Sequence, residues 1–262
     1  MLRYTPILLG AAASVLYSRE RKARIRLERL GAASLETLLE AIDANNPVTG
    51  AHVRRVAQYA LILADSADID EHMKHSIERV ALFHDIGKID EALSDIINET
   101  TKLTPRERRA IMTHPRRGAQ VLKPLTAFFP DLADGVLSHH ERWDGTGYPR
   151  HLKGNRIPLA ARIVSIADTF DAVTHSRSYS HARSIKVATS VISEGRGTQF
   201  DPDLVDLFLS PPVLKCVSQS KNETIGPKRA ERTRREGKKS QGIPDITFRW
   251  RTPTLAQRRT DR

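Results

Sequence analysis

The 262-residue sequence is poor in cysteine and in aromatic side chains, and each shortage excludes a class of protein. Cys216 is the only cysteine, so the chain can form no disulfide with itself and no zinc site built from several thiolates. A single thiol is also typical of a reducing compartment. Aromatic residues make up 5% of the chain, so the core must consist mainly of Leu, Ile, Val and Ala, which favours a helical protein.

Long apolar runs are also lacking. The stretch 4–17 (YTPILLGAAASVLY) is about 14 residues long, shorter than the roughly 20 that cross a bilayer. The basic run 18–29 (SRERKARIRLER) follows it, which favours a short anchor on an anionic membrane. A secretory signal would carry its charge before the apolar run. We therefore expect a cytoplasmic chain whose residues 4–29 attach it to a membrane surface or, alternatively, form a terminal helix that packs on a partner.

The net charge of +11 lies at the two ends of the chain. Residues 1–30 carry seven basic and two acidic side chains, and residues 221–262 carry thirteen basic and five acidic ones, which leaves the interval between them slightly negative. The chain becomes polar after Cys216, which predicts a largely disordered basic tail over 218–262. Such a tail attracts polyanions, but its basic run contains no aromatic residue, so a nucleic-acid partner is disfavoured.

Apolar residues recur every three or four positions through most of the chain, and no segment alternates as strands do. The sequence therefore predicts an all-α domain. Thr104–Pro105 and Asp201–Pro202 are typical of helix starts, and 143–158 is rich in Gly and Pro, which predicts a loop. The expected helices span 35–44, 51–66, 71–86, 104–122, 132–142, 158–173, 184–194 and 202–209.

His84 and Asp85 lie in ERVALFHDIGK (78–88), at the end of an apolar helix. Buried charge is costly there unless it is paired or bound to a metal. An Asp can bridge two cations while the adjacent imidazole binds one of them, as a two-metal hydrolytic site requires. The pair is equally compatible with a capping Asp beside a hydrogen-bonded His.

Further residues of the metal-binding kinds occur at the expected helix ends, and they strengthen the metal hypothesis. Imidazole and carboxylate without thiolate favour iron, manganese, zinc or a similar first-row metal, with iron or manganese preferred here. These additional candidates are His52, His114, His139, His140 and Asp168.

Lys88 follows His84 by four residues, so a continuing helix would place its ammonium group on the same face, where a phosphate would lie. Gly87 would let a substrate approach the backbone closely. The alternative is an exposed lysine at a helix end. Three arginines are further candidates for contacts to an anion, namely Arg55, Arg142 and, as the favoured one, Arg177.

Three motifs appear in order: HDIGK (84–88), HHERWDGTGYP (139–149) and FDP (200–202). Together they resemble the HD-GYP family, a branch of the HD phosphohydrolases, and the resemblance extends from about Thr49 to Phe208. It implies an HD-type bundle of about seven helices, a GYP loop, and hydrolysis of the bacterial second messenger cyclic di-GMP to pGpG or GMP by water that metal ions activate.

The resemblance also assigns roles by position. It implies that Lys88 and Arg177 contact phosphate, that Lys88 and Asp85 are catalytic, and that Gly147, Tyr148 and Pro149 shape the substrate side. The implied metal ligands are His52, His84, Asp85, His114, His139, His140 and Asp168, with Asp85 bridging.

The chain departs from the family pattern at two places. Members with a third metal often have a glutamate four residues before the first ligand histidine, where this chain has Val48, so we expect two divalent metal ions. The segment 89–104 (IDEALSDIINETTKLT) differs from the family's usual Ile-Pro-Asp segment, which leaves substrate preference open. Hydrolysis of another nucleotide or cyclic dinucleotide, and a catalytically weak signalling module, remain alternatives.

The expected organisation is a short N-terminal segment (1–30), an HD-GYP-like domain (31–217) and the basic tail (218–262). No sensory domain fits into the first 48 residues. We therefore expect regulation through the N-terminus, a signalling partner or a homodimer.

Overall fold

The computed structural model describes residues 5–88, 104–175 and 182–225. These residues form ten α-helices and three short 3-10 helices, and their only β-type pairing is one isolated bridge between Arg196 and Phe200. The expected all-α fold is therefore confirmed. The elements are α1 (Thr5–Asn45), α2 (Pro47–Ser66), α3 (Glu71–Phe83), η1 (Ile86–Lys88), α5 (Pro105–Ile111), α6 (His114–Leu122), η2 (Lys123–Ala127), α7 (Leu132–Ser138), η3 (Gly154–Arg156), α8 (Leu159–Thr174), α9 (Ile185–Glu194), α10 (Pro202–Phe208) and α11 (Pro211–Ile225).

Internal contacts divide the chain into two compact units, one of residues 39–227 and the other of residues 1–38 with 228–262. In the second unit the described part is the first portion of α1, a single 41-residue helix that contains both the apolar stretch and the basic run. Across the described helices, α1 included, none combines the length and the apolar character needed to span a bilayer.

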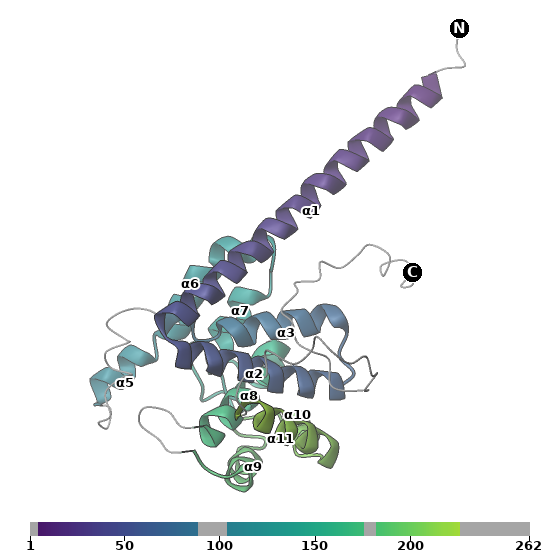
Figure 1. Ribbon diagram of the computed structural model, residues 1–262. Helices are drawn as coiled ribbons and strands as arrows, with labels where there is room; N and C mark the ends of the chain where they lie inside the picture. The colour runs from purple at the N-terminus through teal and green to yellow at the C-terminus, as the bar shows by residue number, and fades with distance from the viewer. Residues whose placement is uncertain (1–4, 89–103, 176–181, 226–262) are drawn as a thin grey trace, which may run out of the picture. The chain divides into compact units, whose positions relative to one another are not determined.

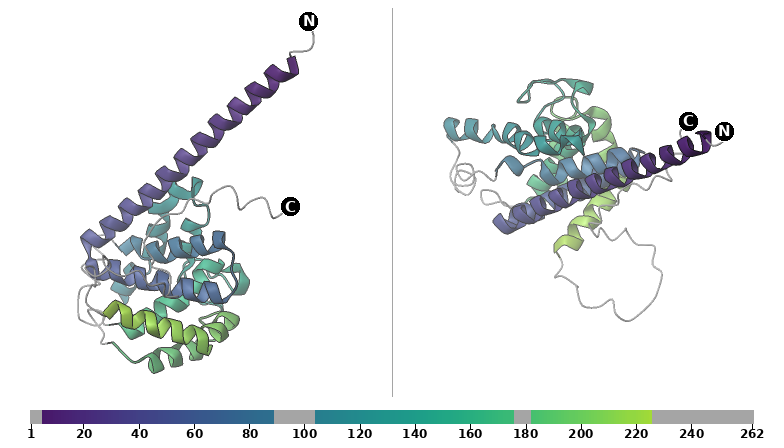
Figure 2. Two further views of the ribbon diagram at one scale, coloured as in Figure 1. Left: turned by 45° about the vertical axis from the view of Figure 1, so that its right-hand side comes forward. Right: turned by 90° about the horizontal axis from the view of Figure 1, so that it is seen from above.

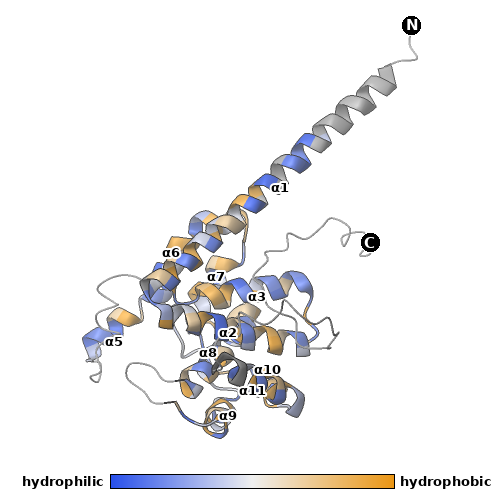
Figure 3. Cartoon of the chain, viewed as in Figure 1, coloured by the Kyte–Doolittle hydropathy of each residue, from blue (hydrophilic) through white to orange (hydrophobic). Residues whose placement is uncertain are grey.

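The larger unit is a helical bundle around α2, α3 and α8, which pack against one another (Figures 1 and 2). Helix α7 lies on α3 and α8, and α11 runs beside α2. Orange and blue residues alternate along these helices, as expected where one face meets the core and the other meets solvent (Figure 3). The core contains few large rings and many aliphatic side chains, among them Leu63, Val80, Ile163, Val164 and Phe170, all fully buried.

Three helices are shorter than the sequence predicts. Helix α3 ends at Phe83 instead of residue 86, α7 ends at Ser138 instead of 142, and the expected helix 104–122 is divided into α5 and α6. A histidine follows each of these ends or breaks, and its ring nitrogen contacts a carbonyl in the last turn of the preceding helix. Helix C-termini leave such carbonyls without a backbone partner. The histidines therefore satisfy the helix ends, a role that apolar periodicity does not reveal.

The two helix starts predicted at Thr104–Pro105 and Asp201–Pro202 are confirmed, whereas α1 and α2 begin at Thr5 and Pro47 instead of residues 35 and 51. Thr104 forms a capping box with Glu107 at α5, and the side chain of Asp201 accepts a hydrogen bond from the Asp203 amide at the start of α10. Asn46 caps α2 by accepting from the amides of Val48 and Thr49. Each of these side chains occupies a donor that the first helical turn leaves unpaired.

The boundary expected at residue 217 falls inside α11, which continues to Ile225. The polar sequence of this segment conceals a buried stripe of Val213, Val217 and Ser220, spaced four and three residues apart. The domain therefore extends further than composition indicates. Residues 226–262, the rest of the expected tail, lie outside the described residues.

Candidate metal centre

The seven predicted metal ligands come from five separate segments of the larger unit, and the fold brings all of them together. His52 lies on α2, and Asp168 lies on α8, the neighbouring helix. The other ligands stand at helix boundaries, where the backbone turns and aims them inward. These are His84 and Asp85 after α3, His114 at the start of α6, and His139 and His140 after α7.

The imidazole rings are held so that one nitrogen of each faces the centre. Nδ1 of His52 donates to Oδ2 of Asp171 at 2.6 Å. Three further rings donate from Nδ1 to the carbonyl three residues earlier: His84 to Ala81 (2.7 Å), His114 to Ile111 (2.7 Å) and His139 to Val136 (2.6 Å). Because carbonyl and carboxylate oxygens accept only, these four contacts place the proton on Nδ1 and leave a lone pair on Nε2.

The carboxylate of Asp85 lies between two sets of these nitrogens. Its Oδ1 is 3.3 Å from Nε2 of His114 and 3.9 Å from Nε2 of His139. Its Oδ2 is 3.6 Å from Nε2 of His84 and 3.9 Å from Nε2 of His52. One oxygen thus faces each set, which is the arrangement of a bridging ligand.

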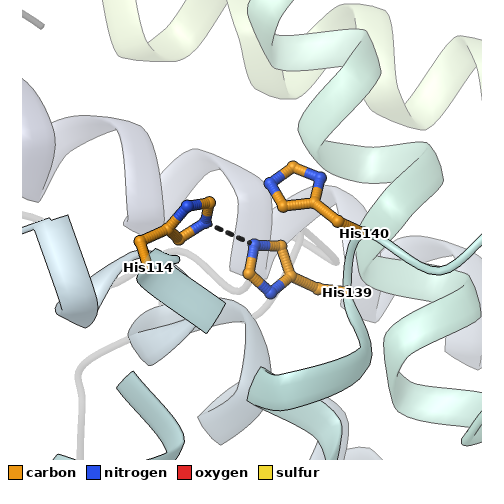
Figure 4. A group of neighbouring side chains, drawn as sticks. All are labelled: His114, His139 and His140. Atoms are coloured by element: carbon orange, nitrogen blue, oxygen red, sulfur yellow. Dashed lines mark hydrogen bonds between the residues drawn. The ribbon is translucent and has the colours of Figure 1, made fainter. Parts of the chain in front are cut away.

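Two groups of candidate ligands stand on either side of Asp85. His114, His139 and His140 form one group, whose rings converge in Figure 4, and His52, His84 and Asp168 form the other. Within each group the ligand atoms lie within 4.8 Å of one another. Each group therefore offers three protein ligands, and Asp85 is available to both.

Buried atoms at the centre fit a cation. Nε2 of His84 and Oδ1 of Asp85 have no hydrogen-bond partner, although both are buried, and such groups are costly unless a ligand satisfies them. Nε2 of His114 lies 3.1 Å from Nε2 of His139, so two lone pairs face each other. Metal ions, one in each ligand group, would satisfy these four atoms.

Burial and neighbouring charges keep three of these imidazoles neutral, as metal ligands must be. Burial lowers the pKa of His84 and, together with the neighbouring rings, lowers the pKa of His139 further. Burial followed by the charge of His114 lowers the pKa of His140 to about 3. His84, His139 and His140 are therefore neutral and able to coordinate metal at neutral pH.

Lys88 pairs with the bridging carboxylate. Its Nζ donates to Oδ2 of Asp85 at 2.6 Å. Burial alone would raise the pKa of Asp85, but Lys88 and the adjacent His84 outweigh it and hold the pKa well below its usual range. Lys88 stands in a 3-10 turn, three residues after Asp85, rather than on the continuing helix that the sequence indicated. The ammonium group nevertheless lies at the centre.

The GYP loop packs against one ligand of the centre. The Tyr148 ring stacks on the His140 ring with centroids 5.0 Å apart and an interplanar angle of 23°, and the Tyr148 amide donates to the His140 carbonyl at 3.2 Å. The Pro149 carbonyl accepts from Arg116 at 3.1 Å. Burial, with the charges of Asp85 and Asp168, raises the pKa of Tyr148 above its usual value, so its hydroxyl stays protonated.

Gly147 and Gly87 both allow two backbone segments to approach closely. A Cβ atom on Gly147 would lie 2.3 Å from the Arg142 amide nitrogen and 2.6 Å from the His140 carbonyl oxygen. A Cβ atom on Gly87 would lie 2.1 Å from the His114 carbonyl oxygen. The sequence suggested that Gly87 leaves room for substrate, but the structure shows that it leaves room for the first turn of α6.

We expect Gly147→Ala to lower the free energy of unfolding by about 2–3 kcal/mol, because its methyl group would meet backbone atoms that cannot move aside. Thermal denaturation should show a fall in Tm of roughly 5–10 °C. Gly154→Ala is the matched control: its Cβ meets open space and only the φ of +59° is unfavourable, which costs about 1 kcal/mol. Equal losses in the two variants would contradict the close-packing explanation for Gly147.

Two of the three arginines suggested as anion contacts already have partners. Arg55 donates to Asp171 from Nε at 2.6 Å and from Nη2 at 3.0 Å. Arg142 pairs with Asp144 at 3.0 Å, and this guanidinium, the largest of several contacts, lowers the pKa of Asp144 to about 2. Both arginines therefore hold the site together instead of facing a ligand. Arg177 lies outside the described residues.

Sequence reasoning missed two buried carboxylates beside the centre. Asp171 accepts hydrogen bonds from His175, His52 and Arg55, and these outweigh its burial and hold its pKa well below the usual range. Glu141 accepts from the amides of Arg150 and Leu152 at 2.6 and 2.9 Å and so fixes the end of the GYP loop. The spacing of Asp171, three residues after Asp168, could have signalled it; Glu141 lies inside the HHERWDG motif.

Comparisons with known proteins agree with this geometry. The HD domain family model matches residues 36–204. A cyclic di-GMP phosphodiesterase of Vibrio cholerae is 36% identical over 68% of this chain, and a 3'3'-cGAMP-specific phosphodiesterase of the same organism is 37% identical over 65% of it. The chain spans 38% of the length of each of these relatives.

A crystal structure of a cyclic GMP-AMP-specific phosphodiesterase of V. cholerae is 25% identical, with a TM-score of 0.50, and the match covers 75% of this chain and 52% of that one. The family model covers more than half of the chain, and the HD pair and the GYP loop lie together at one centre. The chain therefore belongs to the HD domain family, in its HD-GYP branch.

Proposed function

We propose that this chain is a metal-dependent phosphodiesterase that hydrolyses a cyclic dinucleotide, with cyclic di-GMP converted to pGpG or GMP as the principal reaction. The observation that carries the proposal is the position of the Asp85 carboxylate, one oxygen toward each ligand group. Two-metal sites of this kind stabilise both the attacking and the leaving oxygen in phosphodiester hydrolysis. The names of the relatives support the same reaction.

The proposed cofactors are two divalent transition-metal ions, one in each ligand group, with iron or manganese favoured. The imidazole and carboxylate ligands fit iron, manganese, zinc or a similar first-row metal. Val48 lies one turn before His52 on α2, is 67% exposed and offers no ligand atom, which supports two ions and not three. Bound there, the ions would supply Lewis acidity and a water activated near neutral pH.

The remaining site residues are proposed to act on the substrate. Lys88 holds its ammonium group at the Asp85 carboxylate, from where it can also stabilise negative charge on a phosphoryl oxygen. Tyr148 keeps a hydroxyl beside His140 that can donate a hydrogen bond, and Gly147 and Pro149 hold the loop that carries it. Arg177 is proposed as a second phosphate contact.

A second substrate, 3'3'-cGAMP, is supported by one specific observation. Relatives named for cyclic di-GMP and for 3'3'-cGAMP match this chain with nearly the same identity, 36% and 37%. The two substrates share the phosphodiester ring and differ in one base, so the same metal chemistry serves both. The choice between them depends on contacts to the base.

The test is hydrolysis by purified chain, loaded with Mn²⁺ or with Fe²⁺ under exclusion of air. Equal concentrations of cyclic di-GMP, 3'3'-cGAMP and cyclic di-AMP would be incubated separately, and products separated by chromatography. We expect pGpG or GMP from cyclic di-GMP. A sample with two metal ions per chain that leaves all three substrates intact over hours would refute the proposed activity, and faster turnover of 3'3'-cGAMP would select the second substrate.

Regulation is proposed to reach the site through residues 4–29, a signalling partner or a homodimer. We also propose that residues 4–29 contact an anionic membrane surface in the cytoplasm. The support is the row of exposed basic side chains on α1, Arg19, Arg21, Lys22, Arg26 and Arg29, because basic residues near a membrane each add to binding of anionic lipid. Sedimentation with vesicles containing phosphatidylserine, compared with neutral vesicles, tests the contact.

A further inference from the structure

Asp171 is a buried carboxylate in contact with four donor atoms beside the metal centre. It lies on α8, one turn after Asp168, and is 1% exposed. Its Oδ2 accepts from Nδ1 of His52 at 2.6 Å and from Arg55 at 3.0 Å. Its Oδ1 accepts from Arg55 at 2.6 Å and lies 3.0 Å from Nδ1 of His175. Only the contact to His52 involves a candidate metal ligand. Arg55 and His175 belong to neither ligand group.

Two matched pairs of residues lie on the adjacent helices α2 and α8. His52 and Arg55 are three residues apart on α2, and Asp168 and Asp171 are three residues apart on α8, so each pair occupies one helix face. Nε2 of His52 lies 3.4 Å from Oδ1 of Asp168, while its Nδ1 contacts Asp171. Asp171 therefore binds the His52 ring at Nδ1, while Asp168, a candidate ligand of the same group, faces Nε2.

His52 differs from the other ligand rings in how its proton is placed. His84, His114 and His139 stand at helix boundaries and donate to a free carbonyl there. His52 lies within α2, where backbone carbonyls are already used by the helix. A side chain from another helix must supply the acceptor, and Asp171 does so.

We propose that Asp171 is a positioning residue for His52: it keeps the proton on Nδ1, presents the lone pair of Nε2 to the metal, and thereby sets the metal affinity of the group His52, His84 and Asp168. The inference rests on the proposed metal centre. Partners of this kind typically change metal affinity by about 10–100-fold when they are removed. The group His114, His139 and His140 should not respond, because its rings use backbone acceptors or the GYP loop.

The test is a competition titration with a coloured chelator on the full chain, using Mn²⁺ or Zn²⁺. In Asp171→Ala we expect one of the two bound ions to be held about 10–100-fold more weakly and the other to change less than about twofold. Asp171→Asn keeps a carbonyl oxygen that can accept from Nδ1 of His52, so its affinity should lie between those of Asp171→Ala and the wild type. If Asn and Ala weaken binding equally, loss of negative charge explains the effect and the positioning role is wrong.

Asp201→Ala is the matched control. Asp201 is also a buried carboxylate paired with an arginine, at 2.6 Å from Arg162, but it caps α10 and contacts no ligand group. The Asp201→Ala variant should have a lower thermal stability than the wild type and the same affinity for both metal ions. An equal loss of metal in Asp201→Ala would assign the effect to general destabilisation and overturn the inference.

A second measurement needs neither a variant nor metal. The ¹⁵N spectrum of histidine-labelled, metal-free wild-type chain distinguishes protonated from bare ring nitrogens, and we expect His52 to show a protonated Nδ1 and a bare Nε2. A neutral ring whose single proton is on Nε2 would overturn the inference even if the Ala variant does not fold. Fewer than two ions bound to the wild type would refute the two-metal proposal, while this spectrum would still decide the role of Asp171.

Discussion

Asp85→Asn is expected to reduce hydrolysis of the cyclic dinucleotide by at least about 1,000-fold while the chain remains folded. In this variant an NH₂ group replaces one of the two carboxylate oxygens, each of which faces one ligand group. An amide NH₂ group donates hydrogen bonds and does not accept them, so the side chain can no longer bridge the two groups. It also leaves Lys88 without the carboxylate that it contacts at 2.6 Å. Steady-state assays and metal analysis on the same preparation would measure both losses.

Asp206→Asn is the control for this experiment. Asp206 is exposed and pairs with Arg196 on the surface, and such pairs contribute little to stability. Its activity should stay within about twofold of the wild type. If Asp85→Asn keeps more than a tenth of wild-type activity with normal metal content, Asp85 does not bridge. Signalling output that survives in a His84→Ala, Asp85→Ala double variant would instead favour the alternative in which the chain is a catalytically weak signalling module.

The sequence was most informative about residue types that occur in a fixed spacing. The candidate ligands His52, His84, Asp85 and Asp168 could be chosen from motifs, and the structure brings each of the two histidines within 4 Å of both carboxylates. Motifs can locate candidate ligands because a metal centre needs those residue types and few substitutes for them.

Residues that support the ligands were much harder to predict. Asp171 resembles any polar residue on an amphipathic helix until the neighbouring helix is in place, because its partners His52 and Arg55 lie more than 100 residues away in sequence. Arg55 was misread for the same reason. An arginine three residues after a ligand suggests an anion-binding side chain, and only the fold shows that the anion is Asp171.

The helix ends had a different source of error. Periodicity continues through His84 and His139, so it extends α3 and α7 by three or four residues too far. The helices stop because the ring of each histidine takes a carbonyl that the helix would otherwise leave unpaired. The same hydrogen bond thus caps the end of the helix and orients the ring of the candidate ligand. Local sequence patterns do not reveal this bond.

Removal of metal is expected to abolish hydrolysis and also to lower the stability of the larger unit. A ligand that binds the folded state at 100 to 1,000 times its Kd stabilises it by about 3–4 kcal/mol per site. With two sites the Tm should fall by roughly 10 °C or more on exhaustive chelation. The physical reason is that buried atoms such as Nε2 of His84 and Oδ1 of Asp85 then have no partner.

Calorimetry before and after chelation would measure this fall, and re-addition of Fe²⁺, Mn²⁺ or Zn²⁺ in separate samples would show which ion restores both Tm and activity. The His84→Ala, Asp85→Ala variant provides the control, because it lacks the carboxylate that faces both groups and one ligand of the group His52, His84 and Asp168. Its Tm should fall less on chelation than that of the wild type. A wild-type chain that loses its metal but keeps its Tm within 1–2 °C, a shift worth roughly 0.5 kcal/mol, would mean that the helices hold the ligands in place without the ions. The centre would then be preformed by the packing of α2, α3 and α8, and metal would contribute to catalysis alone.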